Sequence, residues 1–536
     1  MRSNIGRSNI GASPSMTAKY AASVASRETI STMSGDRSVI VSSAAGKRLR
    51  NSRDNRPVPQ PISRIWGAGG NGQLGNGTTT NSRNPVTVTG LTGATQLVGG
   101  YYYNCALMSG GTVRCWGYNA YGQLGDNSTT NRTTTVATST ITNLTQITAG
   151  EHHTCGVRRD GTVWCWGYNG YGQLGDGTTT NRYSPVAVSG ITALLPAVEL
   201  TAGDNHTCAR LSDGTLRCWG YNGNGQLGDG TTTNRNAPIP VMGVTDAVQI
   251  AVGDRFSCAL RQSGAVVCWG YNNIGQLGDG TTAQRVIPGA VPGITDATRR
   301  VAGSLHLCVR RATGAVQCWG GGTSGQLGDG GFVNRARIAP GVFAVPASES
   351  CTGMGCGEIQ MSVTGYTGCT LTPSNRVACW GFNNNRQLGD SLATGGYRTA
   401  ADYVEGLTDV AQVETGASHT CAITLDGALW CWGDNAFGQL GDGMTEDLPV
   451  PTIVEHMAEA VEITIPNVEA PGPAEPPVEL RLLAEEKCWS FSVPVAVLVM
   501  EKDLENGIYR ISMLSSYFCL LILRIALCLF YCLYSL

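Results

Sequence analysis

Short runs of alternating apolar and polar residues, separated by glycine-rich turns, fill most of the chain between residues 64 and 455. The segment from Cys155 to Cys165 is typical, because two such runs flank the triplet Arg159, Asp160 and Gly161. Alternation with a period of two predicts β-strands. A three-residue loop that ends in glycine predicts a hairpin, since glycine tolerates the left-handed conformation of that position. The same position holds glycine in five further hairpins and Asn375 in a seventh.

The hairpins belong to a long internal repeat. Trp-Gly recurs at intervals of 50 to 61 residues, and Gln-Leu-Gly follows seven residues after each tryptophan. The tryptophans are Trp66, Trp116, Trp166, Trp219, Trp269, Trp319, Trp380 and Trp432. A repeat of this length, built from short strands, predicts one antiparallel sheet per unit and a propeller for the whole array.

The predicted fold class is all-β, a seven-bladed β-propeller, because seven hairpins are present. Eight Trp-Gly segments accompany those seven hairpins, so two segments compete for one place in the ring. We expect the Trp66 segment to join the blade that contains Trp432 and so tie the two ends together. An eighth, partial blade is the alternative.

Cysteines flank the seven hairpin turns in pairs that are each ten residues apart. The pairs are Cys105 with Cys115, Cys155 with Cys165, Cys208 with Cys218, Cys258 with Cys268, Cys308 with Cys318, Cys369 with Cys379 and Cys421 with Cys431. Directly opposed strand residues have Cα atoms about 4.5–5.5 Å apart, which a disulfide can bridge. The spacing therefore predicts one disulfide per blade, with fourteen buried free thiols as the alternative. Cys351 and Cys356 are predicted to form an eighth bridge. Zinc is not favoured, since one hairpin supplies only two ligands.

The combination of Trp-Gly, Gly-Gln-Leu-Gly-Asp-Gly and a Cys-Ala-Leu…Gly-x-Val-x-Cys hairpin resembles the regulator of chromosome condensation repeat family. The resemblance covers about residues 64 to 455. It implies a seven-bladed β-propeller that binds proteins on one rim. Members include a nuclear exchange factor for a Ran-type GTPase, a plant UV-B photoreceptor and a secreted bacterial inhibitor of β-lactamase. The paired-cysteine form of the repeat is more similar to that of extracytoplasmic bacterial members than to that of the nuclear ones.

Composition narrows the classes of function. Hydrophobic residues make up 42% of the chain, which is enough for a large core, and 72 glycines suit a fold with many tight turns. Charged residues make up only 14%, and the net charge is −2, so no nucleic-acid partner is expected. The sequence holds no phosphate-binding loop, nucleophile elbow or His-Glu-x-x-His pattern. We therefore expect no catalytic residue, no cofactor and no metal, and a protein that is not an enzyme.

Aromatic residues follow the Trp-Gly dipeptides and are the candidate partner-binding residues. They are Tyr118, Tyr121, Tyr168, Tyr171, Tyr221, Tyr271, Phe382 and Phe437. Equivalent positions of successive blades lie on one rim, so these side chains would form a partial aromatic ring, with Asn119, Asn169 and Asn222 beside it. Aromatic residues are enriched in protein interfaces. The alternative is that they pack over the neighbouring blade.

Two other repeated polar positions are predicted to be structural. Four histidines precede hairpin cysteines by two residues, but other blades carry Tyr103, Phe256 or Thr367 there, so imidazole chemistry is not required. These are His153, His206, His306 and His419. The aspartates after Gln-Leu-Gly are expected to cap turns and to pair with arginines six residues later. Those pairs are Asp126 with Arg132, Asp176 with Arg182 and Asp229 with Arg235.

The expected domains are a disordered Ser/Arg-rich arm (1–62), the propeller (63–458), a linker (459–514) and a candidate transmembrane tail (515–536). Residues Ser515 to Leu536 would span about 33 Å as a helix, enough for a bilayer. A misread coding frame is the alternative for this tail. The disulfides favour an extracytoplasmic location, secreted or at the cell surface, since they need an oxidising compartment. A cytoplasmic location is the alternative.

The predicted function is a non-enzymatic interaction module whose rim binds a partner protein not identified by the sequence. The insertion at 336–366 is the candidate specificity element, because it breaks the symmetry of the blades. Guanine-nucleotide exchange on a small GTPase, implied only by the family, is the first alternative. Carbohydrate binding by the aromatic ring is the second.

Overall fold

The computed structural model describes residues 38–43, 62–338, 360–363, 365–391, 396–455, 460–464, 497–502 and 509–514. These residues form strands and turns only, without a helix. The chain divides into two compact units, 1–469 and 470–536. In the second unit, β32 (Val497–Lys502) and β33 (Tyr509–Leu514) form an antiparallel pair. The first unit contains all eight Trp-Gly segments.

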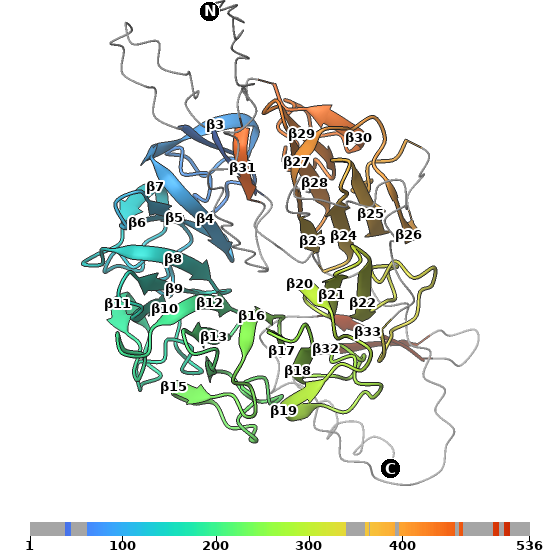
Figure 1. Cartoon of the computed structure of the whole chain (residues 1–536). Helices are drawn as coiled ribbons and strands as arrows, with labels where there is room; N and C mark the ends of the chain where they lie inside the picture. The colour runs from blue at the N-terminus through green and yellow to red at the C-terminus, as the bar shows by residue number, and fades with distance from the viewer. Residues whose placement is uncertain are drawn as a thin grey trace, which may run out of the picture. The chain divides into compact units, whose positions relative to one another are not determined.

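Seven sheets of the first unit follow one another around a ring (Figure 1) and repeat the same antiparallel order. Their innermost strands are β4 (Ala94–Gly100), β8 (Leu144–Ala149), β12 (Ala197–Ala202), β16 (Ala247–Val252), β20 (Ala297–Ala302), β23 (Met361–Val363) and β27 (Val410–Thr415). The second strands are β5 (Tyr103–Met108), β9 (His153–Arg158), β13 (His206–Leu211), β17 (Phe256–Arg261), β21 (His306–Arg311), β24 (Thr367–Leu371) and β28 (His419–Thr424).

The third strands are β6 (Val113–Gly117), β10 (Val163–Gly167), β14 (Leu216–Gly220), β18 (Val266–Gly270), β22 (Val316–Gly320), β25 (Val377–Phe382) and β29 (Leu429–Gly433). The outer strands are β7 (Arg132–Ala137), β11 (Arg182–Ala187), β15 (Arg235–Pro240), β19 (Arg285–Ala290), β26 (Tyr397–Tyr403) and β30 (Leu448–Ile453). We number these sheets blades 1 to 7 in chain order. Blade 5 (β20–β22) has three described strands, and its outer position carries a single bridge between Gly320 and Arg335. The predicted all-β propeller with seven repeated blades is confirmed.

The cysteine hairpins have the predicted register, because the two cysteines of each blade are direct cross-strand partners. All seven pairs have Cα atoms 4.1 Å apart and sulfur atoms at bonding distance, as the ten-residue spacing predicts. The disulfides join Cys105 to Cys115, Cys155 to Cys165, Cys208 to Cys218, Cys258 to Cys268, Cys308 to Cys318, Cys369 to Cys379 and Cys421 to Cys431.

The alternative of free thiols in these hairpins is not what the structure shows, since every one of the fourteen sulfur atoms is paired. The left-handed loop position is also confirmed, with φ of 78° at Gly161 and 58° at Asn375. The eighth predicted bridge, Cys351 with Cys356, lies outside the described residues.

The seam between the ends of the propeller differs from the expectation. The Trp66 strand does not join the sheet of Trp432. It lies in a further sheet, the closing sheet, with strand order β3 (Ser82–Thr92), β2 (Ile62–Gly67), β1 (Ser38–Ser43) and β31 (Ala460–Thr464). This arrangement corresponds to the alternative of an additional blade. It arises because both ends of the unit supply a strand, one from the expected arm and one from the expected linker.

Buried tryptophans connect each sheet to the one before it. All eight are fully buried, and each indole N–H donates to the backbone oxygen of the preceding sheet's Gln-Leu-Gly glutamine, at 2.8–3.0 Å. In blade 2, for example, Trp166 donates to the carbonyl oxygen of Gln123 over 2.9 Å. The leucine that follows each glutamine is buried as well. The predicted structural role of these repeated residues is therefore supported by their contacts.

Candidate interaction surface

The tyrosines that follow Trp-Gly lie where the third strand of a blade ends. The backbone N–H of Tyr118 donates to the carbonyl oxygen of Tyr102 over 2.8 Å, and that of Tyr168 to His152 over 2.9 Å. These bonds fix the loop after the third strand against the loop between the first and second strands of the same blade. Both loops therefore contribute side chains to one end of each blade.

Five of the predicted aromatic residues form a continuous row over blades 1 to 3. Ring centroids are 6.3 Å apart for Tyr118 and Tyr121, and 5.1 Å for Tyr121 and Tyr168. The row continues from Tyr168 to Tyr171 over 6.1 Å, and from Tyr171 to Tyr221 over 5.1 Å. All four contacts are edge-to-face, and their distances are favourable for aromatic pairs. We call these five side chains the tyrosine row.

Two further rings extend the row at its blade 1 end. The His152 ring lies 4.8 Å from Tyr121, and the Tyr101 ring lies 5.3 Å from His152. Burial lowers the pKa of His152 to about 4, so its ring is neutral at pH 7. Neither residue was predicted to belong to this surface, because the loops between first and second strands carry no repeated aromatic position. The adjacent run Tyr101-Tyr102-Tyr103 was the available signal.

The row is partly exposed and partly packed against its own loops. The Tyr171 side chain is 38% exposed, and the other four residues are half-buried. A Cβ added at Gly170 would stand 2.3 Å from the hydroxyl oxygen of Tyr168, and Gly223 has the same relation to Tyr221. These rings therefore lie over glycines that hold them in place, while their outer surfaces remain accessible.

The other three predicted aromatics do not join the row. Contact between blades depends on a second aromatic in each loop, such as Tyr121 or Tyr171. Blade 3 has Asn224 at that position, so the row ends at Tyr221 and does not reach Tyr271. Phe437 is half-buried in blade 7. The predicted aromatic ring is thus not continuous around the rim.

Phe382 belongs to a second, smaller group in blades 5 and 6. Its ring lies 6.3 Å from Tyr366 and 5.6 Å from Tyr397, and Phe332 lies 5.4 Å from Tyr397. Phe332 and Tyr397 are 51% and 40% exposed. Because Phe332 and Tyr397 do not follow a Trp-Gly dipeptide, the repeat pattern gave no sign of them.

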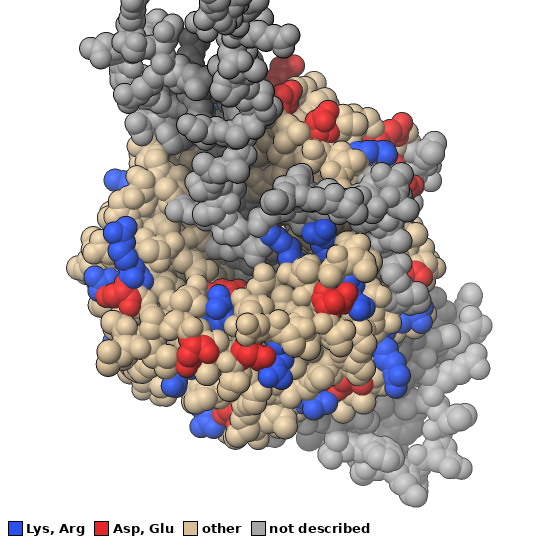
Figure 2. Space-filling model, in the orientation of Figure 1, with Lys and Arg blue, Asp and Glu red and all other residues tan. Residues whose placement is uncertain are grey.

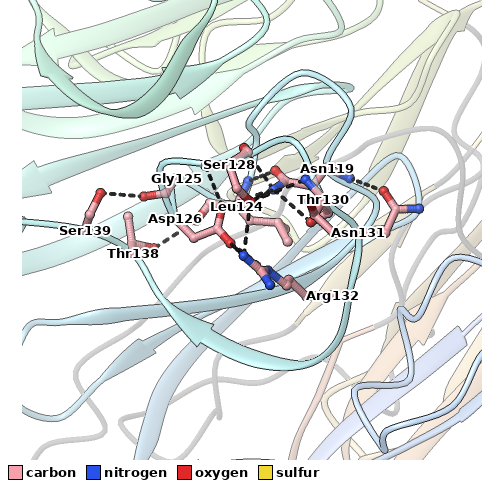
Figure 3. Close-up of polar contacts among 10 residues, drawn as sticks. All are labelled: Asn119, Leu124, Gly125, Asp126, Ser128, Thr130, Asn131, Arg132, Thr138 and Ser139. Carbon is pink, nitrogen blue, oxygen red and sulfur yellow. Dashed lines mark hydrogen bonds and ion pairs between the residues drawn. The ribbon is translucent and has the colours of Figure 1, made fainter.

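The asparagines beside the tyrosines are buried and not part of the surface, which corrects the sequence interpretation. Figure 3 shows Asn119 at the centre of its loop, fully buried. Its side-chain amide donates to Asp126 and to the Thr130 carbonyl oxygen, both over 3.1 Å, and its Oδ1 accepts from the Leu124 N–H over 3.0 Å. Asn169 and Asn222 make the same contacts in blades 2 and 3. The side-chain amides of these asparagines therefore bind backbone groups of their own loops, and not a partner as the sequence pattern had suggested.

The predicted Asp–Arg pairs are confirmed in these loops. Arg132 contacts Asp126 over 2.6 Å, and both Arg182 with Asp176 and Arg235 with Asp229 are 2.7 Å apart. Burial acts to raise the pKa of Asp126, but hydrogen bonds from Ser128 and Arg132 outweigh it and lower the pKa. The arginines of the three loops are thus engaged by their own carboxylates.

Two of the repeated histidines contact the next blade. His153 is fully buried, and its Nε2 is 2.9 Å from the hydroxyl of Thr207 in the next blade. That hydroxyl donates to the Gln173 carbonyl oxygen over 3.1 Å, so Nε2 carries the hydrogen. His206 has the same relation to Ser257, at 3.1 Å. Burial lowers the pKa of both imidazoles, to about 3 and about 4. These contacts support a structural role.

Two carboxylates stand beside the tyrosine row, in the loops between first and second strands. The Glu151 side chain is 30% exposed, and its backbone carbonyl accepts the Tyr101 N–H over 2.9 Å. Asp204 occupies the equivalent position in blade 3 and is partly exposed. On the face shown in Figure 2, basic and acidic residues are interspersed without a large area of one sign.

Within the described part of the chain, no group of three or more histidine, cysteine or acidic residues could hold a metal ion. No helix among the same residues is long and apolar enough to cross a membrane. The candidate tail, Ser515 to Leu536, lies outside the described residues.

Comparison with known proteins matches the RCC1-like domain model to residues 63–300 and 193–468. Among curated proteins, the probable E3 ubiquitin-protein ligase HERC4 of Rattus norvegicus is 32% identical over 101 residues, which are 18% of this chain and 10% of the relative. Protein pim1 of Schizosaccharomyces pombe is 33% identical over 112 residues, 18% of this chain and 21% of the relative. The match thus spans about a tenth to a fifth of these relatives.

Solved structures support the fold. Yeast RCC1 (Prp20), crystallised with Kap60, has a TM-score of 0.52 at 18% identity, covering 65% of this chain and 85% of the other. Human WBSCR16 has a TM-score of 0.51 at 20% identity, covering 67% and 99%. At these identities the similarity concerns the architecture of the propeller.

Proposed function

The chain belongs to the RCC1-like domain family, and we propose that its propeller is a non-enzymatic interaction module whose tyrosine row contacts a partner protein. The observation that carries this proposal is the continuity of the row across blades 1 to 3, with ring centroids 5.1–6.3 Å apart. Aromatic side chains that are rigidly held and partly exposed contribute strongly to protein interfaces, because they bury a large area at little cost in conformational entropy.

The proposal that the module is not an enzyme is supported by the state of its polar groups. The interblade histidines are buried, and burial keeps the pKa of His153 and His206 far below 7. The loop aspartates are paired with arginines. The HERC relatives are named as ligases, but this chain matches only 10% of their length. Ligase activity is therefore not carried over to this chain.

A photo-crosslinking amino acid at position 171 tests the proposal directly. In cells of the source organism, crosslinked adducts are expected at Tyr171. They are not expected at the matched position Leu425, which is 63% exposed in a hairpin at the opposite end of blade 7. Adducts at Leu425 alone, or equal adducts at both positions, would overturn the proposed surface.

The insertion at 336–366, most of which lies outside the described residues, remains our candidate for the specificity element. Because β23 (Met361–Val363) is a core strand of blade 6, the deletion is limited to residues 339–359. It should change which adducts form at position 171 while the disulfides of the blades persist. Unchanged adducts would exclude a role in specificity.

Two alternatives concern the same propeller. Guanine-nucleotide exchange on a small GTPase is supported by the family, since Prp20p of Saccharomyces cerevisiae, which shares the fold, binds Gsp1p and histones. Release of labelled nucleotide from candidate GTPases tests it. Carbohydrate binding is supported by the exposed tyrosines, and a glycan array tests it. Nucleotide release or glycan binding that is lost when the tyrosine row is substituted would replace the proposed protein-binding function.

We further propose an extracytoplasmic location, secreted or at the cell surface, with a cytoplasmic one as the alternative. Seven cysteine pairs at bonding distance support it, because cytosolic thiols are normally kept reduced. Attachment to a membrane through Ser515 to Leu536 belongs to the same proposal. Protease digestion of intact cells tests the location. Carbonate extraction of the membrane fraction tests the attachment.

A further inference from the structure

We propose that the tyrosine row, together with Glu151 and Asp204, binds a basic segment of the partner, with arginine side chains stacked on the tyrosine rings. This inference rests on the proposed function and adds the chemistry of the partner. It follows from three features of the same end of blades 1 to 3: open aromatic faces, carboxylates beside them, and basic residues that are already engaged.

The ring geometry leaves aromatic faces available. Each contact in the row is edge-to-face, with interplanar angles of 60° to 83°. In that arrangement the edge of one ring covers only part of the next, and Tyr171 remains 38% exposed. The electron-rich face of such a ring attracts cations, and the planar guanidinium of arginine also stacks on it.

Carboxylates give this end of the blades a negative potential. The Glu151 carbonyl oxygen accepts the Tyr101 N–H, and the Glu151 carboxylate lies 3.7 Å from Nε2 of His152, whose ring is 4.8 Å from that of Tyr121. The pKa of Tyr101 is raised to about 12 by a hydrogen bond with Tyr102 and by burial, and Glu151 adds to this increase electrostatically. Asp204 repeats the position of Glu151 in the next blade, and the carbonyl oxygen of the following residue, Asn205, accepts the Tyr221 N–H over 2.8 Å. The two carboxylates are therefore placed at intervals along the row.

Basic side chains do not cancel this potential. The arginines of the neighbouring loops pair with aspartates at 2.6–2.7 Å. His152 is neutral at pH 7, because burial lowers its pKa to about 4. The next arginine in the loops between first and second strands is Arg255, in blade 4, beyond the end of the row. A cationic segment is thus favoured over a neutral or acidic one along blades 1 to 3.

Fluorescence anisotropy with a labelled peptide of alternating glycine and arginine tests this inference. Matched peptides with lysine or glutamate in place of arginine provide the comparison. The arginine peptide should bind most tightly, the lysine peptide more weakly and the glutamate peptide weakest. Equal binding of all three peptides would overturn the inference.

Substitutions identify the surface. Tyr171→Leu and Tyr121→Leu should each weaken binding of the arginine peptide about two- to fivefold, while Tyr171→Phe, which keeps the aromatic face, should leave it nearly unchanged. Tyr183→Leu is the matched control, since Tyr183 is 45% exposed but lies outside the row, on β11. Glu151→Gln should weaken binding, and Asp213→Asn, in a hairpin at the other end of blade 3, should not.

The Tyr→Phe variant keeps the test independent of folding, and thermal unfolding of every variant checks that the propeller is intact. Equal losses for Tyr171→Leu and Tyr183→Leu, or loss in Tyr171→Phe, would contradict stacking on the row. The proposed function fails separately, if crosslinking at position 171 captures no partner. If it captures a partner whose contact segment is acidic or a glycan, the proposed surface survives but the basic-segment inference is wrong.

Discussion

The indole N–H of Trp66 donates a hydrogen bond of 2.9 Å to the backbone oxygen of Gln439, a residue 373 positions later in the chain. The same bond joins each blade to the preceding one elsewhere in the ring, as between Trp219 and Gln173. Trp66 also packs with Cys421, Leu429 and other buried residues of blade 7. The two ends of the propeller are therefore connected in the same way as its interior blades.

Replacing Trp66 with phenylalanine should selectively open this seam. The variant leaves the buried Gln439 carbonyl without its donor, and we expect a loss of about 1–3 kcal/mol in the free energy of unfolding. Trp219→Phe, which breaks an equivalent bond inside the ring, is the matched control. Hydrogen exchange should increase in β2 and β30 only for Trp66→Phe. Identical exchange patterns for the two variants would show that the ring does not close through Trp66.

The disulfides should account for fourteen of the twenty cysteines, which leaves six. Thiol titration of denatured, unreduced protein should therefore find no more than six reactive groups. Replacing Cys155 and Cys165 together by alanine should lower the free energy of unfolding by about 2–3 kcal/mol, because a short loop in the unfolded chain is no longer closed. Twenty reactive thiols in the native sequence would contradict the pairing.

The buried histidines should make stability depend on pH in a defined window. Burial, with smaller contributions from His206 and His152, lowers the pKa of His153 from 6.5 to about 3. The unfolded chain binds this proton near pH 6.5 and the folded protein does not, so stability should fall as pH decreases from about 6.5 towards 3. The full effect of one such group is about 5 kcal/mol, at about 1.4 kcal/mol per pKa unit.

A residue swap between blades tests this titration. In blade 1, Tyr103 stands in place of His153, and its hydroxyl accepts from Thr154 over 3.0 Å and donates to the His153 carbonyl oxygen over 2.7 Å. His153→Tyr should therefore keep a partner for Thr207 and reduce the pH dependence of thermal unfolding, and Tyr103→His should increase it. Unchanged slopes in both variants would mean that the imidazoles do not titrate with unfolding.

Position 375 should accept glycine more readily than a β-branched residue. Its φ is 58°, in the left-handed region, where glycine occurs in the other six hairpins. Asn375→Gly should keep the stability of the native protein or raise it slightly, whereas Asn375→Val should lower the free energy of unfolding by about 1–2 kcal/mol through backbone strain. Chemical denaturation of the two variants compares them. Equal stability would show that the turn adopts another conformation.

Repetition explains which parts of the fold were predictable. Cysteine spacing and the glycine or Asn375 turn position recur in seven hairpins, so a single local rule predicted all of them. The closing sheet was not predictable, since β1 and β31 occur once each and pair with one another from opposite ends of the unit, as Ile40 does with Thr464. Local pattern contains no information about such a pairing.

The candidate surface was predictable only in part, for a different physical reason. The repeat placed Tyr118 and Tyr168 on one rim correctly, but ring contact between blades also depends on a second aromatic, which blade 3 lacks because it has Asn224 there. The polarity of Asn119 suggested a surface position. Asn119 is buried because backbone groups of its loop, such as the Thr130 carbonyl and the Leu124 N–H, need its amide as a hydrogen-bond partner. A sequence pattern does not show which backbone groups need such a partner.

The innermost strands provide a last test, because blade 3 departs from a polar contact that blades 1 and 2 share. Gln146 in β8 makes two hydrogen bonds to the backbone of Leu200 in the next blade. Its Nε2 donates to the carbonyl oxygen and its Oε1 accepts from the N–H, both over 3.1 Å. Blade 3 carries Glu199 at this position, which accepts the Ile250 N–H over 3.3 Å but has no hydrogen for the Ile250 oxygen. Arg300 of blade 5 supplies that donor and also contacts Glu199 over 2.9 Å.

Glu199→Gln should therefore destabilise the propeller when made alone, because Arg300 loses its carboxylate in a partly buried site. Arg300→Leu alone should also destabilise it, since the Ile250 oxygen then has no donor. In the double variant, position 199 holds a glutamine, as position 146 does in blade 2. Position 300 holds an aliphatic residue, as position 200 does in blade 3. The double variant should be more stable than the sum of the single losses predicts, with a coupling of about 0.5–3 kcal/mol. Additive losses in denaturant titrations would show that Arg300 does not compensate for the missing amide.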